Sequence, residues 1–305
     1  MKFEKFSAEK DGFYGAYFPC RKKSERCVIL MAGDNVDDYM AKKGAAWLND
    51  HDINCMNMAP AKNDYSHHNY PLERFERALE VIQARGNTKF GIAGASTTAM
   101  LALTAASYFP EFTLTIAMSP SDFVMEGFYR DGKDGAEERP GDDESSISRQ
   151  GKGLPYLPYA YRHPQYWQKI AEEGKRTGNR IASRDMFEES ERLHPLQEEE
   201  LIKVERIKGH LILIGAEDDV LWNTAKYIRR MAERLESHAH DCTYEALVYE
   251  KGTHYVFPES FMKKMIPFTD LLPKLMFVSG RKYPEECRIT RTDIDKHVNN
   301  AFISW

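Results

Sequence analysis

Short apolar runs recur along the chain, and most of them are followed by a segment with helical spacing. Each run has the length of one buried strand, and segment 71–85 begins with proline and places Phe75 and Leu79 on one helical face. The expected strands are residues 26–32, 53–58, 89–95, 113–118, 210–215 and 244–249. The expected helices are residues 37–50, 71–85, 96–108 and 223–237. This alternation predicts an α/β fold with a mostly parallel sheet covered by helices on both faces.

Segment 121–208 interrupts this alternation. It holds no comparable apolar strand, and its charged, glycine-rich first part is followed by GLPYLPYAYRHPQYW, which is dense in proline and aromatic residues. One helix is expected at 183–193. Long insertions in α/β domains usually serve as lids or substrate pockets. We therefore expect residues 1–305 to form a single domain, with a lid over the end of the sheet at about 121–208.

Composition excludes several classes of function. The formal net charge of -5 gives no reason to expect a nucleic-acid or membrane partner. No secretory signal is visible, and no run approaches the roughly 18 apolar residues of a membrane span. The five cysteines lack metal-ligand spacing and are expected to be free thiols: Cys20, Cys27, Cys55, Cys242 and Cys287. We expect a cytoplasmic protein without metal or other cofactor, and its oligomeric state stays open.

The sequence GAST, beginning at Gly94, stands where an expected strand becomes a helix. In a nucleophile elbow, a serine on such a turn projects its hydroxyl above the sheet, and the helix N-terminus behind it favours negative charge. The usual pattern is G-x-S-x-G, whereas Thr98 occupies the last position here. Ser96 is therefore read either as a nucleophile or as an ordinary helix N-cap.

Candidate partners for Ser96 follow in the chain order typical of this arrangement. Glu217, Asp218 and Asp219 come just after an apolar strand, and His254 comes just after the last expected strand. Alone, the acidic cluster could be a solvated turn and the histidine a structural one. Because the carboxyl ends of parallel strands share one edge of the sheet, the three matches together predict a Ser-His-Asp site.

At this level of detail the sequence resembles the catalytic α/β-hydrolase domain shared by acyl-CoA thioesterases and bile acid-CoA:amino acid N-acyltransferases. The resemblance spans roughly residues 26–270, and five stretches carry it: IAGAST, GKGLPYLPY, IKVERIKGHLILIGAEDDVLW, YEKGTHYVFP and PLERFERALEVI. It implies an α/β-hydrolase fold with an inserted lid. Only about 25 residues precede the first expected core strand, so we expect a bacterial-type member without the β-sandwich domain of the eukaryotic proteins.

The resemblance also implies roles for individual residues. It places the nucleophile at Ser96, the histidine at His254 and the acid at Asp219, with Asp218 as the competitor. The implied substrate is a small acyl ester or thioester, cleaved through an acyl-enzyme. Two alternatives stay open: an acyltransferase that passes the acyl group to an amine or alcohol, and a catalytically silent homologue that binds a ligand.

Two positions depart from the family pattern. The family's Lys-Gly after the serine is Thr97-Thr98 here, and its glycine-rich turn after the first core strand is Ala32-Gly33-Asp34-Asn35. The Thr97 N–H is expected to be one oxyanion donor, and the second is assigned to the N–H of Asp34, with that of Asn35 next.

Candidate substrate-binding residues lie in three places. They are Asn35 in the turn after the first core strand, His67 in the loop after the second, and Tyr156 and Tyr159 in the insertion. The tyrosines could form an apolar acyl pocket, or they could pack the insertion onto the body. A metal site at His67 and His68 would need further ligands, which the sequence does not provide at a suitable spacing.

Overall fold

The computed structural model describes residues 2–59, 67–127, 145–161, 165–266 and 269–305. Its centre is an eight-stranded sheet in the order β1-β2-β4-β3-β6-β7-β10-β11. The strands are β1 (Glu4–Phe6), β2 (Tyr14–Phe18), β3 (Arg26–Leu30), β4 (Asn54–Ala59), β6 (Lys89–Ala95), β7 (Phe112–Met118), β10 (His210–Ala216) and β11 (Thr243–Tyr249). From β4 to β11 all neighbouring strands are parallel, while β2 pairs antiparallel with both β1 and β4. The prediction of a mostly parallel sheet is therefore confirmed.

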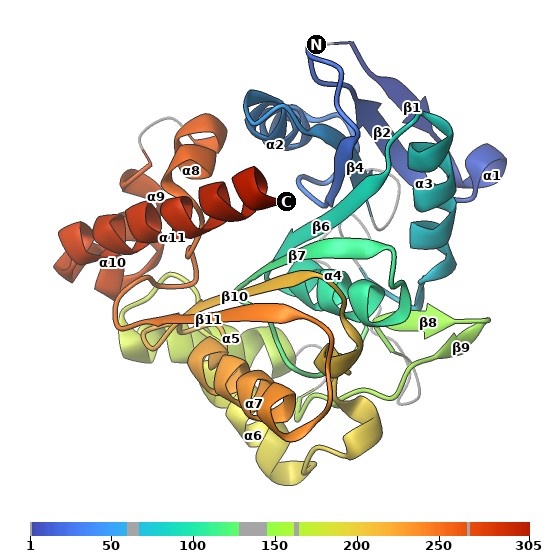
Figure 1. Ribbon diagram of the computed structural model, residues 1–305. Helices are drawn as coiled ribbons and strands as arrows, with labels where there is room; N and C mark the ends of the chain where they lie inside the picture. Colours follow the sequence, from blue (N-terminus) through green and yellow to red (C-terminus); the bar gives the residue numbers. More distant parts are fainter. Residues whose placement is uncertain (1, 60–66, 128–144, 162–164, 267–268) are drawn as a thin grey trace.

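Side chains of the central strands alternate between two apolar layers. In β3, Cys27 and Ile29 join one core, and Val28 and Leu30 join the other. Helices α3 (Glu73–Ala84), α4 (Thr97–Tyr108) and α7 (Thr224–Ser237) cover the first face. Helices α2 (Tyr39–Asp50), α8 (Glu259–Met265) and α11 (Pro284–Ser304) cover the second (Figure 1). The sheet is thus buried on both faces, as its apolar runs predict.

The structure adds elements at both ends that the sequence analysis did not assign. At the start, β1 and β2 extend the sheet, with the four-residue helix α1 (Ala8–Asp11) between them. At the end, α8, α9 (Leu271–Met276), α10 (Val278–Lys282) and α11 follow the last strand. Helix α11 buries Ile294, Val298 and Phe302 at helical spacing while most of its other residues are polar. That narrow apolar stripe gives a weaker sequence signal than the apolar strands.

Between β7 and β10 the chain forms a separate group of short elements beside α7. They are α5 (Gln165–Thr177), α6 (Arg184–Leu193), two 3₁₀ turns, η1 (Glu198–Glu200) and η2 (Val204–Arg206), and the strands β8 (Ile147–Arg149) and β9 (Lys152–Gly153). These two strands form a small sheet with β5 (Tyr70–Pro71), which comes earlier in the chain, between β4 and α3. The helix predicted at 183–193 is confirmed as α6. The first, charged part of the insertion lies largely outside the described residues.

Ion pairs connect the insertion to α7. Lys226, Arg230 and Arg234 lie one helical turn apart and pair with acidic side chains of the insertion, namely Glu191, Asp122, Glu198 and Glu205. The strongest pairing is at Asp122, where the Arg230 guanidinium donates from both Nε and Nη2 to the carboxylate, with Nε–Oδ2 at 2.6 Å. Burial raises the pKa of Asp122 to about 6, although Arg230 lowers it.

We predict that Arg230→Met lowers the free energy of unfolding by about 3 kcal/mol, because it leaves the Asp122 carboxylate buried without its partner. The loss should shrink as the pH falls, because the pKa of Asp122 rises further once Arg230 no longer lowers it, and protonation then removes the unpaired buried charge. Urea unfolding at several pH values measures both effects.

The matched control is Arg192→Met. The Arg192 side chain is 67% exposed and pairs only with Glu189 among the ion pairs of the described residues, so its removal should change stability by less than about 0.5 kcal/mol. Equal losses in the two variants would contradict the account of the buried pair.

Candidate active site

Ser96 occupies a strained turn between β6 and α4. Its backbone angles are φ 59° and ψ -129°, a conformation that non-glycine residues rarely adopt. The Ser96 N–H donates to the Met118 carbonyl at 2.8 Å, which ties the turn to the end of β7. A Cβ on Gly94 would lie 2.1 Å from the Thr98 carbonyl, so glycine is required there. The turn has the geometry of a nucleophile elbow.

Thr98, which departs from the usual motif, stabilises the turn itself. Its hydroxyl donates to the Ala95 carbonyl at 2.8 Å and accepts from the Ala95 N–H at 2.9 Å. Both backbone groups of the residue before Ser96 are thereby satisfied by one side chain. Strand β6 and helix α4 approach each other closely at Gly94. Position 98 can therefore hold a residue with a side chain.

His254 and Asp219 meet in the interior at the end of the sheet. The His254 Nδ1 lies 2.8 Å from the Asp219 Oδ2, and both residues are almost fully buried. The other carboxylate oxygen of Asp219 accepts from the Leu221 N–H at 2.9 Å. A buried carboxylate bonded in this way fixes both the orientation and the tautomer of the imidazole.

Asp218, the competing acid, has a different set of partners. Its Oδ1 accepts from the N–H groups of Gly252 and Thr253 at 2.9 and 2.8 Å, and its Oδ2 accepts from the Ser279 hydroxyl. Burial raises the pKa of Asp218, while these hydrogen bonds act to lower it. The geometry thus pairs His254 with Asp219, while Asp218 holds the loop that carries His254.

Two further contacts fix His254, and the sequence analysis did not identify either residue as functional. The Ser119 hydroxyl donates to the His254 carbonyl at 2.9 Å, and the Trp222 ring stands edge-on to the imidazole at a centroid distance of 4.8 Å. Trp222 Nε1 in turn donates to the Ser119 carbonyl at 3.1 Å. Ser119 follows β7 directly, so His254 and Ser96 are both tied to the same end of that strand.

The second ring nitrogen of His254, Nε2, is buried and has no hydrogen-bond partner among the described residues. No hydrogen bond joins it to the Ser96 hydroxyl in this structure. Catalytic hydrogen bonds are often long without substrate and shorten in the complex. The arrangement leaves this nitrogen able to accept a proton at the edge where Ser96 lies.

The turn after β3 carries the predicted second oxyanion donor. Gly33 has φ 84°, and a Cβ there would lie 2.3 Å from the Asp38 carboxylate. The N–H groups of Asp34 and Asn35 both donate to the Asp38 Oδ2, at 2.8 and 3.1 Å. Asp38 also accepts from the Ala41 N–H as the N-cap of α2. Any donation from Asp34 to an oxyanion would therefore be shared with Asp38.

His67 lies against the elbow. It is 1% exposed, and its Nε2 lies 2.7 Å from the hydroxyl of Thr97, the residue after Ser96. The structure thus brings His67 to the predicted site. Its contact with substrate stays a prediction. Thr97 is the first residue of α4, so its N–H has no partner within the helix.

The predicted tyrosines lie in the insertion. Tyr156 is half-buried, whereas Tyr159 is 8% exposed and packs between the rings of Tyr166 and Phe187. Phe187 stands edge-on to Trp222 at 5.4 Å, and Trp222 contacts His254. Most of the Tyr159 surface therefore serves packing, and a line of aromatic rings joins the insertion to the histidine.

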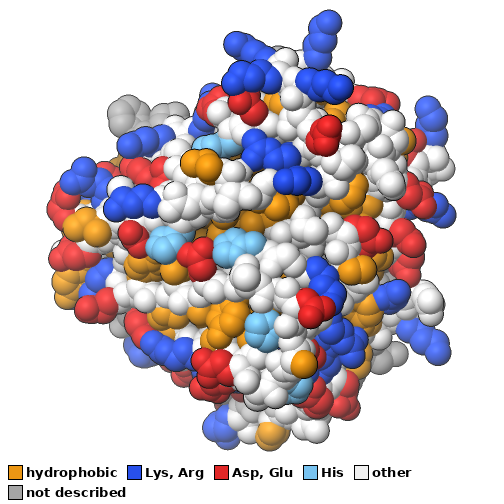
Figure 2. Space-filling model, in the orientation of Figure 1, with side chains coloured by type: hydrophobic (Ala, Val, Ile, Leu, Met, Phe, Trp, Pro, Cys, Tyr) orange, Lys and Arg blue, Asp and Glu red, His pale blue; other side chains and the backbone are white. Residues whose placement is uncertain are grey.

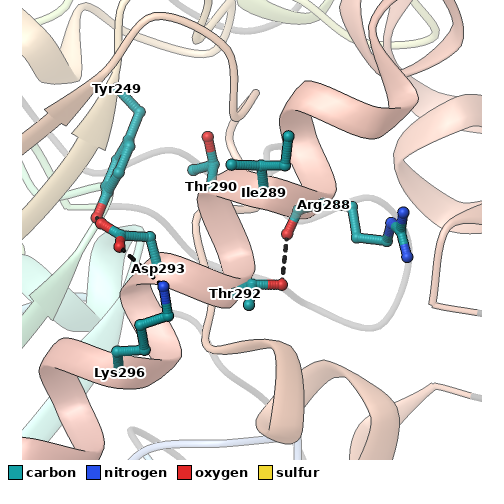
Figure 3. A pocket seen from close by; sticks show the side chains of 7 residues that line it. All are labelled: Tyr249, Arg288, Ile289, Thr290, Thr292, Asp293 and Lys296. Carbon is teal, nitrogen blue, oxygen red and sulfur yellow. Dashed lines mark hydrogen bonds and ion pairs between the residues drawn. The ribbon is translucent and has the colours of Figure 1, made fainter.

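The structure gives little sign of other sites. Among the described residues, no group of three His, Cys, Asp or Glu side chains is arranged to hold a metal ion, and no helix has the length and apolar content to cross a membrane. Acidic and basic side chains are interspersed over most of the face in Figure 2. A hollow of about 520 Å³ beside α11 is lined by Tyr249, Asp293 and Lys296 among others, not by Ser96, Asp219 or His254 (Figure 3).

Comparison with solved structures shows what the fold is similar to. A candidate dienelactone hydrolase from Klebsiella pneumoniae subsp. pneumoniae MGH 78578 has a TM-score of 0.54 at 8% identity and covers 100% of this chain and 98% of its own. An esterase from Pyrococcus furiosus has a TM-score of 0.49 at 13% identity and covers 97% of this chain and 90% of its own. At such low identities the likeness concerns the fold alone.

Comparison of the sequence is more specific, because a family model matches it, although no curated protein does. The family described as BAAT / Acyl-CoA thioester hydrolase C terminal matches residues 70–285, which is most of the chain and includes Ser96, Asp219 and His254. The protein therefore has an α/β-hydrolase fold and belongs to the BAAT / acyl-CoA thioester hydrolase C-terminal family, which places it among the hydrolases.

Proposed function

We propose that this protein is a serine hydrolase that cleaves a small acyl ester or thioester through an acyl-enzyme on Ser96. The observation that carries the proposal is the buried Asp219–His254 hydrogen bond at the end of the sheet, together with the strained turn of Ser96 at that same end. A serine hydroxyl is a weak nucleophile until an oriented base takes its proton. These residues supply that combination.

In the first step, His254 Nε2 takes the proton of Ser96 as its oxygen attacks the acyl carbonyl. Asp219 holds the Nδ1–H and stabilises the imidazolium that forms. The tetrahedral intermediate collapses, the bond to the alcohol or thiol breaks, and His254 returns the proton to that leaving group. In the second step, His254 deprotonates a water that attacks the acyl-enzyme, which releases the acid and restores Ser96.

The N–H of Thr97 and that of Asp34 are the proposed oxyanion donors. The Thr97 N–H stands at the N-terminus of α4, where negative charge is favoured. The Asp34 N–H is shared with Asp38, so its contribution is weakened. Loss of one oxyanion donor typically costs about 10²–10³ in rate, and we therefore expect a slow enzyme.

An acyltransferase is the second candidate. The family that matches the chain takes its name from an N-acyltransferase as well as from thioester hydrolases. The same acyl-enzyme would then be attacked by an amine or alcohol, with His254 as the base. Product analysis with p-nitrophenyl esters in the presence of amino acids distinguishes the two, because transfer yields an N-acyl amino acid at the expense of free acid.

The nucleophile can be tested by covalent labelling. A fluorophosphonate should add once to the wild type and not to Ser96→Ala, because only an activated serine oxygen displaces fluoride. Intact-mass measurement detects the adduct. Ser107→Ala, on the same helix at a hydroxyl that donates to the Thr104 carbonyl, should label like the wild type. Full labelling of Ser96→Ala would refute the assignment.

The choice between the two acids gives another prediction. Asp219→Asn should slow hydrolysis of a p-nitrophenyl ester by about 10⁴, because the amide favours the wrong imidazole tautomer. Asp218→Asn keeps acceptors for the Gly252 and Thr253 N–H groups and should act mainly on stability. Initial rates and thermal unfolding of both variants measure the difference, and the reverse order of rate loss would contradict the pairing of His254 with Asp219.

Substitutions at Thr98 test whether its hydroxyl stabilises the turn that holds Ser96. Thr98→Val keeps the shape but leaves the Ala95 N–H and carbonyl without their partner, so we expect a loss of about 1–3 kcal/mol of stability and slower labelling of Ser96. Thr98→Ser keeps the hydroxyl and should stay close to the wild type. Urea unfolding and labelling rates together measure this, and two variants that behave alike would exclude a role for the hydroxyl.

A further inference from the structure

The first turn of α6 is bound directly to the loop that carries Asp219. The N–H groups of Ser183 and Arg184 both donate to the Val220 carbonyl, at 2.9 and 3.0 Å. The Ser183 hydroxyl donates to the Leu221 carbonyl at 2.7 Å. Three hydrogen bonds thus join the insertion to the two residues that follow Asp219.

The Arg184 side chain adds two contacts to the same loop. Its Nη1 donates to the Glu217 carbonyl at 2.8 Å and to the Asp219 carbonyl at 3.1 Å. Its Nε donates to the Glu188 carboxylate at 3.2 Å, which also accepts from the Asn223 amide. The guanidinium is therefore held by an acid on its own helix while it bonds the two carbonyls. Lysine keeps the charge but lacks this rigid, planar set of donors.

These contacts act on Asp219, which orients the imidazole of His254 in the proposed reaction. The Asp219 carboxylate bonds to His254 through one oxygen and to the Leu221 N–H through the other, while its carbonyl bonds to Arg184. Rotation of the backbone at Asp219 would move the carboxylate away from the imidazole. A displacement of about 1 Å at a catalytic group can cost about 10²-fold in rate.

We propose that Arg184 is a positioning residue for the reaction, acting through the backbone of Asp219. The proposal rests on the function proposed above. It makes the start of α6 a fixed part of the catalytic framework rather than a segment that lifts off the sheet. Phe187, one turn further along α6, supports the same framework because its ring packs against Trp222, which contacts His254.

Arg184→Ala and Arg184→Lys test this, with Arg192→Ala as the matched control on the exposed face of the same helix. The first measurement is the proton spectrum, because a proton shared between a buried imidazole and a carboxylate resonates far downfield. That signal reports the His254–Asp219 bond directly and needs no substrate. We expect it to weaken or shift in both Arg184 variants and to stay unchanged in Arg192→Ala.

The second measurement is the rate of fluorophosphonate labelling of Ser96. We expect Arg184→Ala to label about 10- to 100-fold more slowly than the wild type, and Arg184→Lys to lie between the two. Added guanidinium chloride, at concentrations that do not unfold the protein, should restore part of the rate in Arg184→Ala, whereas sodium chloride at equal concentration should not. A merely structural role would show no such rescue.

An unchanged downfield signal together with wild-type labelling in Arg184→Ala would overturn the proposal. If Arg184→Ala does not fold, Arg184→Lys decides. A downfield signal and a labelling rate equal to those of the wild type in Arg184→Lys would also overturn the proposal, because they would show that the two guanidinium hydrogen bonds are not needed. A wild type that shows the downfield proton but never labels would refute the serine hydrolase function. In that case the effect of Arg184 on the His254–Asp219 bond would still be read from the spectrum.

Discussion

The hydrogen bond between Asp219 and His254 is the interaction on which the site depends, and it joins residues 35 positions apart. It can form because β10 and β11 are parallel neighbours whose carboxyl ends reach the same edge of the sheet. The same edge receives β6 and β7, and so brings the Ser96 turn to this end. Burial of both partners makes the bond strong and leaves no water to replace either of them.

Around this bond, nearly every neighbouring group has a structural partner. Asp218 fixes the histidine loop, Ser119 fixes the His254 carbonyl, and Arg184 fixes the carbonyl of Asp219. His254 Nε2 differs, since it is one of the buried polar atoms of the described residues that have no hydrogen bond. A buried polar atom without a partner is costly, and such atoms call for an explanation. In the proposed reaction, this nitrogen takes the proton of Ser96.

Much of the fold follows from local patterns in the sequence. The strand predicted at 89–95 is β6, with the same bounds, because an apolar run flanked by turn residues has few other ways to fold. The strands β1 and β2 were not assigned, since the place of β2 in the sheet depends on its distant partner β4 and β1 pairs only through β2. Helix α11 was missed because most of its residues are polar, and packing against the sheet decides its position.

The candidate site divides in the same way. Ser96, Asp219 and His254 carry a signal because each follows an apolar strand in the expected order. Arg184 carries none: nothing in RDMFEESERL distinguishes an arginine that bonds two carbonyls of another loop from one that is solvated. Asp38 is likewise invisible as the acceptor for Asp34, because its effect depends on the path of a tight turn. Long-range side-chain to backbone contacts are the part that only a structure supplies.

The most direct test of the account is to locate the acyl group during turnover. The protein would be mixed with a p-nitrophenyl ester, quenched in acid within the first turnover, digested and sequenced by tandem mass spectrometry. The account predicts an acyl group on Ser96 that disappears as free acid accumulates. Turnover of the ester with no acyl group on Ser96 at any time, or an acyl group on another residue, would contradict it.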